Sequence, residues 1–310
     1  MAADDDEMRA AARAAEVKGQ VGHPEERWNE LIGKIQAQGI RSFDEICEEY
    51  LDLMWCLDCY RVADAPPAGM GRADRPYKSR MDGIYRGKGH WFATLLGLLL
   101  DNRTGQTIRS ISKIDGYSQK HQIDLAWPDR EIAPVVCAES KVTGGPAYRR
   151  YPERRAMADW TNRRKELKFA ATDLKLWRRE QSNKIGHWAS WRSKAAPKTF
   201  MLWGARLTKK DSIERMLRET EALLATYLDG AGVLAWRVNE SEDGYIEVKL
   251  PSGSRVEGLD DALWRIESEI DDAVAAGALH EEVETAAPVD PDDLIDDPPG
   301  DDHRDMETSG

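Results

Sequence analysis

The spacing of apolar residues predicts two helices near the N-terminus of the chain. Within residues 25–38, Trp28, Leu31 and Ile35 recur at intervals of three or four, which is the period of one helical face. The same spacing recurs across residues 43–62, and a serine stands directly before this second segment as a candidate helix cap. The Pro-, Gly- and Arg-rich stretch 64–80 then predicts a linker or a substrate-facing loop.

A different order of elements follows from residue 88 onward. A segment that is apolar on nearly every side predicts a buried helix. Short apolar segments with turns between them predict strands, and longer periodic segments predict further helices. The expected elements are helix 90–100, strands 106–114, 121–127 and 134–142, helix 153–181, strand 199–206, helix 211–229, strands 231–238 and 244–250, and helix 258–275. The order helix, three-stranded meander, helix, strand predicts a mixed α/β core.

Length and composition limit the class of protein. With 310 residues the chain can bury the core of one large domain or of two small ones. It has no run of about 18 apolar residues, so we expect no membrane span. The acidic N-terminus lacks the pattern of a secretory signal, and four cysteines are too few for a disulfide framework. We therefore expect a cytoplasmic protein.

Charge is distributed unevenly along the chain, whose formal net charge is −12. Residues 281–310 contain twelve Asp or Glu and one Arg, a net charge of −11, and few large apolar residues. We expect a disordered acidic tail over 276–310 and a flexible N-terminus over 1–24. Residues 141–210 contain nineteen Lys or Arg and five Asp or Glu, a net charge of +14.

This basic segment, residues 141–210, indicates a polyanionic partner. The alternative is a long helix with a solvated basic face. The acidic tail either folds back on the basic segment and competes with that partner, or only adds solubility.

Three charged residues interrupt two neighbouring predicted strands. Asp124 lies within 121–127, and Glu139 and Lys141 lie near the end of 134–142. Because side chains alternate along a strand, Glu139 and Lys141 project from the same face. Two carboxylates and one ammonium can then converge, and this combination can hold a divalent cation and activate water against a phosphodiester. The alternative is a structural ion pair between Asp124 and Lys141 without a metal.

Hairpin geometry selects Asp124 over a second aspartate, Asp129. In an antiparallel pair the numbers of opposed residues sum to a constant. The polar turn at 129–133 centres the hairpin near position 131, which places Glu139 opposite position 123 or 124. Asp129 falls in the turn itself. We therefore expect Asp124 to face Glu139.

The residues Asp124 … Glu139-Ser-Lys141, taken with the element order over 88–206, resemble the PD-(D/E)xK nuclease superfamily, also called restriction-endonuclease-like. The resemblance implies that Asp124 and Glu139 bind Mg²⁺, for which Mn²⁺ can substitute. It also implies that Lys141 orients or activates the attacking water. A restriction-endonuclease-like core within 88–275 would then follow an N-terminal helical region at 25–87 and continue into a C-terminal α/β extension.

The family's first core helix often adds a glutamate to the site, and residues 88–100 contain none. Other side chains are therefore accessory candidates. They are Gln122, Asp115 and His90, together with a carboxylate from residues 43–52.

Basic residues around the predicted site are expected to contact the phosphates of DNA. One of them precedes the buried helix, and the rest follow the Glu-x-Lys strand. They are Lys88, Arg149, Arg150, Arg154, Arg155, Arg163, Arg164, Lys165 and Lys168.

The resemblance implies a Mg²⁺-dependent DNA endonuclease that hydrolyses phosphodiester bonds, in a restriction or phage-defence role. Such an enzyme is expected to act as a homodimer, because cutting both strands takes two sites related by a two-fold axis. A restriction role would also give it a methyltransferase as a partner. The alternatives are a DNA repair or recombination nuclease, and a catalytically inactive nucleic-acid-binding protein on the same fold.

Overall fold

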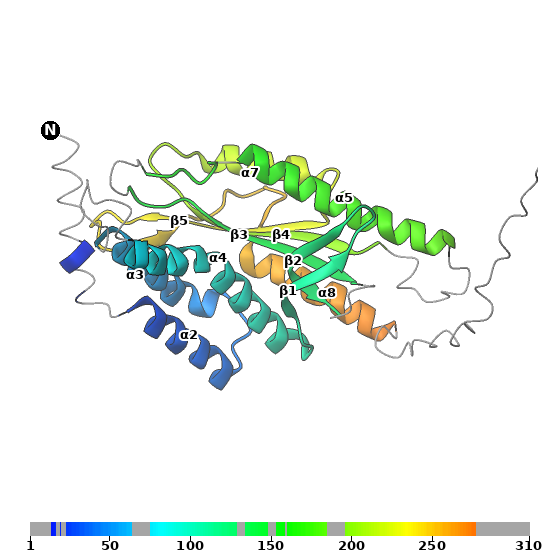
Figure 1. Ribbon diagram of the computed structural model, residues 1–310, viewed down its shortest axis with the longest axis horizontal. Coiled ribbons are helices and arrows are strands. Elements are labelled where there is room, and N and C mark those ends of the chain that lie inside the picture. The colour runs from blue at the N-terminus through cyan, green and yellow to red at the C-terminus, as the bar shows by residue number, and fades with distance from the viewer. Residues whose placement is uncertain are drawn as a thin grey trace, which may run out of the picture.

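The computed structural model describes most of the chain between residues 23 and 276 (Figure 1). The described residues are 14–16, 19, 23–63, 75–128, 134–147, 153–158, 160–184 and 196–276, with the backbone alone at 75–86, 111 and 177–184. The expected disordered tail beyond residue 276 and most of the expected flexible N-terminus lie outside these residues.

A seven-stranded mixed sheet forms the centre of the fold, with the order β1-β2-β3-β4-β5-β6 and with β7 paired to β5. The strands are β1 (Arg109–Asp115), β2 (Lys120–Trp127), β3 (Val136–Thr143), β4 (Lys198–Arg206), β5 (Gly230–Val238), β6 (Tyr245–Glu247) and β7 (Glu257–Gly258). β1, β2 and β3 form an antiparallel meander, whereas β3, β4 and β5 run parallel. Because helices cover both faces of the parallel strands, β4 and β5 are nearly continuous apolar segments.

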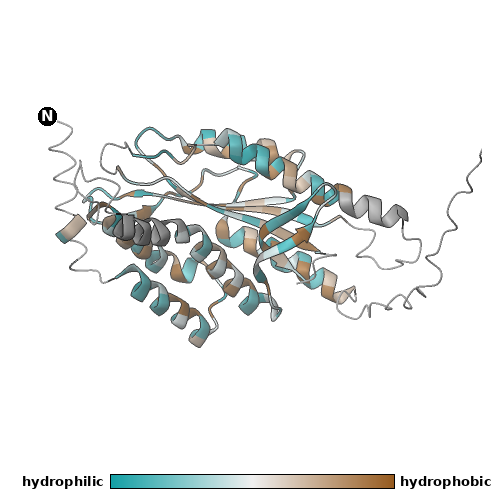
Figure 2. Ribbon diagram, in the orientation of Figure 1, coloured by the Kyte–Doolittle hydropathy of each residue, from teal (hydrophilic) through white to brown (hydrophobic). Residues whose placement is uncertain are grey.

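Helices cover both faces of the sheet (Figure 1). They are α2 (Pro24–Gln38), the 3₁₀ helix η1 (Asp44–Ile46), α3 (Cys47–Ala63), α4 (Arg75–Thr104), α5 (Trp160–Lys184), α7 (Ile213–Leu224) and α8 (Leu259–Ala275). α2, α3, α4 and α8 pack in one core cluster, and α5 and α7 pack in a second cluster on the other face. Figure 2 shows α5 as largely hydrophilic, and its buried side carries Trp160, Leu167 and Ala171. Across the described ranges, no helix has the length and apolar character that a membrane crossing requires.

Local signals set the bounds of α2 close to the predicted 25–38. Pro24 occupies the first helical position, where its missing N–H would have no helical partner. The ring nitrogen Nδ1 of His23 accepts a hydrogen bond from the backbone N–H of Glu25 at 3.3 Å. Gly39, with a φ of 63°, ends the helix in the left-handed conformation that glycine adopts without strain.

The element order predicted from residue 88 onward is confirmed, because α4, β1, β2, β3, α5 and β4 follow one another as helix, three strands, helix and strand. Two expectations are wrong. A loop is expected over 64–80, but α4 begins at Arg75, so residues 75–80 are helical. Residues 64–74 lie outside the described part of the chain. The helix predicted from residue 153 begins at Trp160, because Arg154 instead pairs with Gly145 in an isolated bridge.

Candidate active site

Asp124 and Glu139 face each other across the hairpin of β2 and β3. Leu125 pairs with Ala138 in the antiparallel register, so opposed residue numbers sum to 263. One step further along the hairpin therefore places Asp124 opposite Glu139. The predicted register is confirmed, and the rejected Asp129 lies in 129–133, outside the described residues.

Lys141 contacts both carboxylates. Its Nζ lies 2.7 Å from Oε2 of Glu139 and 3.2 Å from Oδ2 of Asp124. The same oxygen of Asp124 accepts hydrogen bonds from the backbone N–H of Ser140 at 2.8 Å and from its hydroxyl at 3.2 Å. The structure therefore brings the three predicted residues together, and their catalytic roles stay a prediction.

Partial burial sets the protonation of this cluster, whose three side chains are 18% to 24% exposed. Burial raises the pKa of Glu139 to about 7; the ammonium of Lys141 lowers it, and the nearby carboxylate of Asp124 raises it. Burial lowers the pKa of Lys141, but the two carboxylates outweigh it and raise that pKa above its ordinary value. Lys141 is therefore charged at neutral pH, whereas burial favours the protonated form of Glu139 more than in an exposed glutamate.

The cluster offers hard oxygen ligands to a divalent cation. The described residues contain no group of three or more His, Cys, Asp or Glu side chains that could hold a metal ion. Two carboxylates nevertheless suit Mg²⁺, which binds a few carboxylate oxygens and completes its shell with waters and substrate phosphates. The ion pair of Asp124 with Lys141, our alternative to a metal site, is present and compensates part of the same buried charge.

A pocket of about 550 Å³ opens over Asp124 and Lys141, and we call it the triad pocket. Its walls come from four elements of the fold. They contribute Arg61 from α3, Lys88 and His90 from α4, Arg154 from the segment 153–158, and Arg163 from α5. Two of the three catalytic candidates, Asp124 and Lys141, thus lie beneath several cationic side chains, which favours an anionic substrate.

The accessory candidates are placed differently. His90 lines the triad pocket, and Gln122 lines a second pocket of about 270 Å³ that also contains Glu139. Asp115 lines neither pocket; it ends β1 and pairs at 3.2 Å with the lysine that begins β2. That lysine is four residues from Asp124, roughly 13 Å along a strand. The structure therefore does not bring Asp115 to the cluster, and no carboxylate of the fully described segment 43–52 lines either pocket.

The predicted DNA-contacting cations fall into three groups. Lys88, Arg154 and Arg163 line the triad pocket. Three others make contacts within the protein: Arg155 with Asp211, Arg164 with Glu219, and Lys168 over the ring of Tyr227. Lys165 is exposed on α5, and Arg149 and Arg150 lie outside the described residues.

Sequence reasoning missed two residues of the site, Arg61 and Ser140. Arg61 lies near the end of α3, 63 positions before Asp124, and only the packing of α3 brings it to the pocket. Ser140 holds Asp124 through its backbone and its hydroxyl. Strand alternation places a residue between Glu139 and Lys141 on the opposite face, so the sequence contains no signal for this contact.

Comparison of the chain with protein-family models, with curated proteins and with solved structures gives no match.

Proposed function

We propose that this protein is a Mg²⁺-dependent DNA endonuclease of the PD-(D/E)xK type. The convergence of Asp124, Glu139 and Lys141 on neighbouring strands carries the proposal, together with the pocket walled by Arg and Lys that opens over Asp124 and Lys141. The carboxylates supply oxygen ligands for a divalent cation. The surrounding cations suit the phosphates of a nucleic acid.

The position of the cluster within the fold supports the same proposal. The two carboxylates and the lysine lie on the second and third strands of the meander, between α4 and α5 in the chain order. This is the order of elements that the family resemblance implies. A carboxylate in a largely buried strand is unfavourable unless a cation compensates its charge, and Asp124 and Glu139 share the single ammonium of Lys141.

Each residue has a role that its contacts allow. Asp124 and Glu139 would hold Mg²⁺, which when bound supplies a more acidic water and neutralises charge on the phosphate. Ser140 fixes the orientation of Asp124 through two hydrogen bonds. Lys141 would stabilise negative charge that develops on the attacked phosphate, because its ammonium is held in place before substrate binds. Lys88, Arg154 and Arg163 would bind the neighbouring phosphates.

Plasmid cleavage tests this assignment. Supercoiled plasmid is incubated with the protein in EDTA, in Mg²⁺ and in Mn²⁺, and nicked and linear products are measured on a gel. We expect cleavage only with a divalent cation. Asp124→Asn and Lys141→Met should each lower the rate by about 100-fold or more, the usual effect of removing one group that stabilises a transition state.

Asp115→Asn provides a matched control, because it neutralises a carboxylate on the adjacent strand that lines neither pocket. Its cleavage rate should equal that of the wild type. Cleavage that persists in Asp124→Asn and Lys141→Met, or that proceeds in EDTA, would show that the site is assigned wrongly.

A catalytically inactive nucleic-acid-binding protein on the same fold is the second candidate. The direct contacts of Lys141 with both carboxylates favour it, because they compensate the cluster without a metal. Binding of DNA by the wild type without any cleavage in Mg²⁺ or Mn²⁺ would support this candidate over the first.

A further inference from the structure

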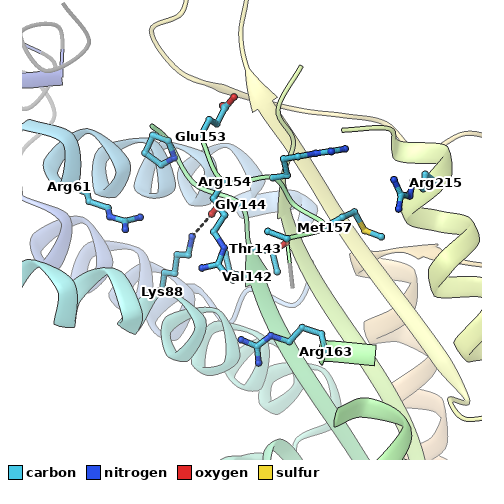
Figure 3. Close-up of a pocket in the computed structure, with 13 residues that line it drawn as sticks. Arg61, Lys88, Val142, Thr143, Gly144, Glu153, Arg154, Met157, Arg163 and Arg215 are labelled. Atoms are coloured by element: carbon cyan, nitrogen blue, oxygen red, sulfur yellow. Dashed lines mark hydrogen bonds between the residues drawn. The ribbon is translucent and has the colours of Figure 1, made fainter. Parts of the chain in front are cut away.

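A second basic pocket adjoins the triad pocket. It has a volume of about 640 Å³, within the range of small-ligand sites, about 300–1,000 Å³. Figure 3 shows Arg61 and Lys88 entering from the helices on one side and Arg215 from the helix on the other. Arg154 and Met157 lie between them. We call it the end pocket; it shares Arg61, Lys88, Val142, Arg154 and Arg163 with the triad pocket, so the two are continuous.

Charge is strongly unbalanced in the end pocket. Its described lining contains six Arg or Lys side chains and one carboxylate, that of Glu153. Oε1 of Glu153 accepts a hydrogen bond at 2.6 Å from Arg206, which does not line the pocket. The one carboxylate is therefore engaged by a cation behind the wall. Two of the six cations, Arg155 and Arg163, pair with Asp211 and Glu166 outside the lining. The lining itself still carries more positive than negative side chains, an excess that an anion would compensate.

The electrostatics of Lys88 support this interpretation. Burial lowers the pKa of Lys88 to about 8; Asp58 raises it, and the nearby guanidinium groups of Arg61, Arg206 and Arg154 lower it. The charged form of this lysine is thus unfavourable beside its neighbours. A bound anion would favour it.

Two cations of the lining also lie at the wrong ends of their helices. Arg163 is in the first turn of α5, which carries no acidic residue there, and Arg215 is in the first turn of α7. Positive side chains at a helix N-terminus oppose the positive end of the helix dipole. An anion bound near Arg163 would offset this interaction at α5, whereas at α7 the acidic Glu214 in the first turn already does so in part.

Hydrogen bonds hold the described part of the end-pocket wall in place without a ligand. Gly145 and Arg154 exchange backbone hydrogen bonds of 3.1 and 3.0 Å, and the carbonyl of Gly145 also accepts from Arg206 at 3.1 Å. Lys88 donates to the carbonyl of Gly144 at 3.0 Å (Figure 3). Gly144 has a φ of +80°, and a Cβ there would lie 2.3 Å from the carbonyl oxygen of Arg206. A pre-formed wall lowers the entropy that a ligand loses on binding.

We propose that the end pocket binds the terminal phosphomonoester of a nucleic-acid strand, beside the triad pocket that holds Asp124 and Lys141. A phosphomonoester carries roughly −1.5 to −2 charges at pH 7, whereas each internal phosphate carries one, so the excess of cations favours the terminal group. Val142, Pro146 and Met157 add an apolar wall that suits a sugar or a base. That a nucleic acid supplies this phosphomonoester rests on the proposed function.

Binding of end-labelled variants of one strand tests the proposal. Three single-stranded oligonucleotides of one sequence carry a 5′-phosphate, a 3′-phosphate or hydroxyls at both ends, with an internal fluorophore. Their anisotropy is titrated with the full-length protein in EDTA at pH 7, so that cleavage plays no part. We expect one phosphorylated strand to bind about tenfold more tightly than the hydroxyl strand, because a terminal phosphate gains one to three charge-assisted hydrogen bonds.

Arg215→Gln should reduce that preference to about twofold or less while the hydroxyl strand binds as before, since Arg215 lines only the end pocket. Arg215 is exposed, so the variant is expected to fold. The matched control is Arg218→Gln, an exposed arginine of the same helix that does not line the pocket, and it should keep the full preference.

Equal binding of all three strands overturns the proposal, and so does a preference that survives Arg215→Gln. The outcome is separate from that of the plasmid assay. A phosphate preference without cleavage would uphold the end pocket and reject the nuclease, and cleavage without a preference would do the reverse.

Discussion

Arg206→Met should destabilise the protein more than any surface substitution, because it leaves a buried carboxylate without its cation. The side chain of Arg206, at the end of β4, is 6% exposed, and that of Asp58, on α3, is 9% exposed. Nε of Arg206 donates to the hydroxyl of Tyr245 at 2.7 Å, and this hydroxyl donates to Asp58 at 2.5 Å. Nη1 of Arg206 binds Glu153 and the carbonyl of Gly145.

The size of the stability loss in Arg206→Met depends on which carboxylate stays buried without a cation. Removing one member of a buried ion pair costs about 3–5 kcal/mol, because the other charge is left uncompensated. Glu153 is 39% exposed and can turn toward water, so the penalty comes from Asp58, which cannot. We therefore expect a loss of about 3 kcal/mol, at the low end of that range.

Urea unfolding followed by tryptophan fluorescence measures this loss. Arg206→Met should shift the midpoint with an unchanged m-value. The control Arg237→Met, on the exposed end of β5, should stay within about 0.5 kcal/mol of the wild type. The double variant Arg206→Met/Asp58→Asn should recover about 1–2 kcal/mol, because the introduced amide carries no charge but still accepts from Tyr245. A loss below about 1 kcal/mol, or strictly additive effects, would show that the buried charge of Asp58 does not depend on Arg206.

Four further substitutions have defined outcomes. Asp173→Ala should lower the free energy of unfolding, measured in urea, by about 1–3 kcal/mol, because it removes the buried partner of His121 at 2.8 Å. Burial raises the pKa of Asp173, but its hydrogen bonds outweigh burial and hold that pKa below its ordinary 3.8. The wild type should therefore lose this contribution to stability as the pH falls below about 4. Lys88 has a pKa lowered to about 8, so binding of the phosphorylated strand should weaken from about pH 7 to 9, and Lys88→Met should abolish that dependence. The same variant should raise the free energy of unfolding at pH 7, because the charged lysine is disfavoured in the folded state. This unfavourable contribution to stability declines only as the pH rises above about 8 and the folded protein releases the proton. Gly232→Ala should lower the free energy of unfolding by about 1–3 kcal/mol, since its Cβ would lie 2.5 Å from a side chain of α8. Gly33→Ala, in open space on α2, should raise the free energy of unfolding by about 0.5–1 kcal/mol.

The parts of the fold that the sequence predicts are those set by local chemistry. Pro24 and Gly39 bound α2 because one lacks an N–H and the other adopts a positive φ. The start of α4 cannot be predicted from such local signals. Residues 75–80 contain a proline and several cations with little apolar periodicity, so composition predicts a loop where the chain is helical.

Some residues of the candidate site are likewise predictable from local sequence, and others are not. Asp124, Glu139 and Lys141 are predictable because one hairpin contains all three, and its turn fixes their register. Arg61 and Arg215 come from helices far away in the chain, and their approach depends on how α3 and α7 pack against the sheet. Spacing along a sequence carries no information about such contacts.

Two residues near the proposed site, Glu139 and Lys88, have pKa shifts opposite in sense to those of the ion pairs that support the fold. In the structural pairs the charged form is favoured: the pKa of Arg206 is raised and that of Asp173 is lowered, because burial is outweighed by their partners. At Glu139 and Lys88, by contrast, burial dominates and the charged form is disfavoured, so the pKa of Glu139 rises to about 7 and that of Lys88 falls to about 8. For both groups, burial outweighs the opposite charge that the protein places nearby. A cation beside Glu139 and a phosphate beside Lys88 would add to that opposite charge, and a phosphodiester bound with Mg²⁺ brings both at once.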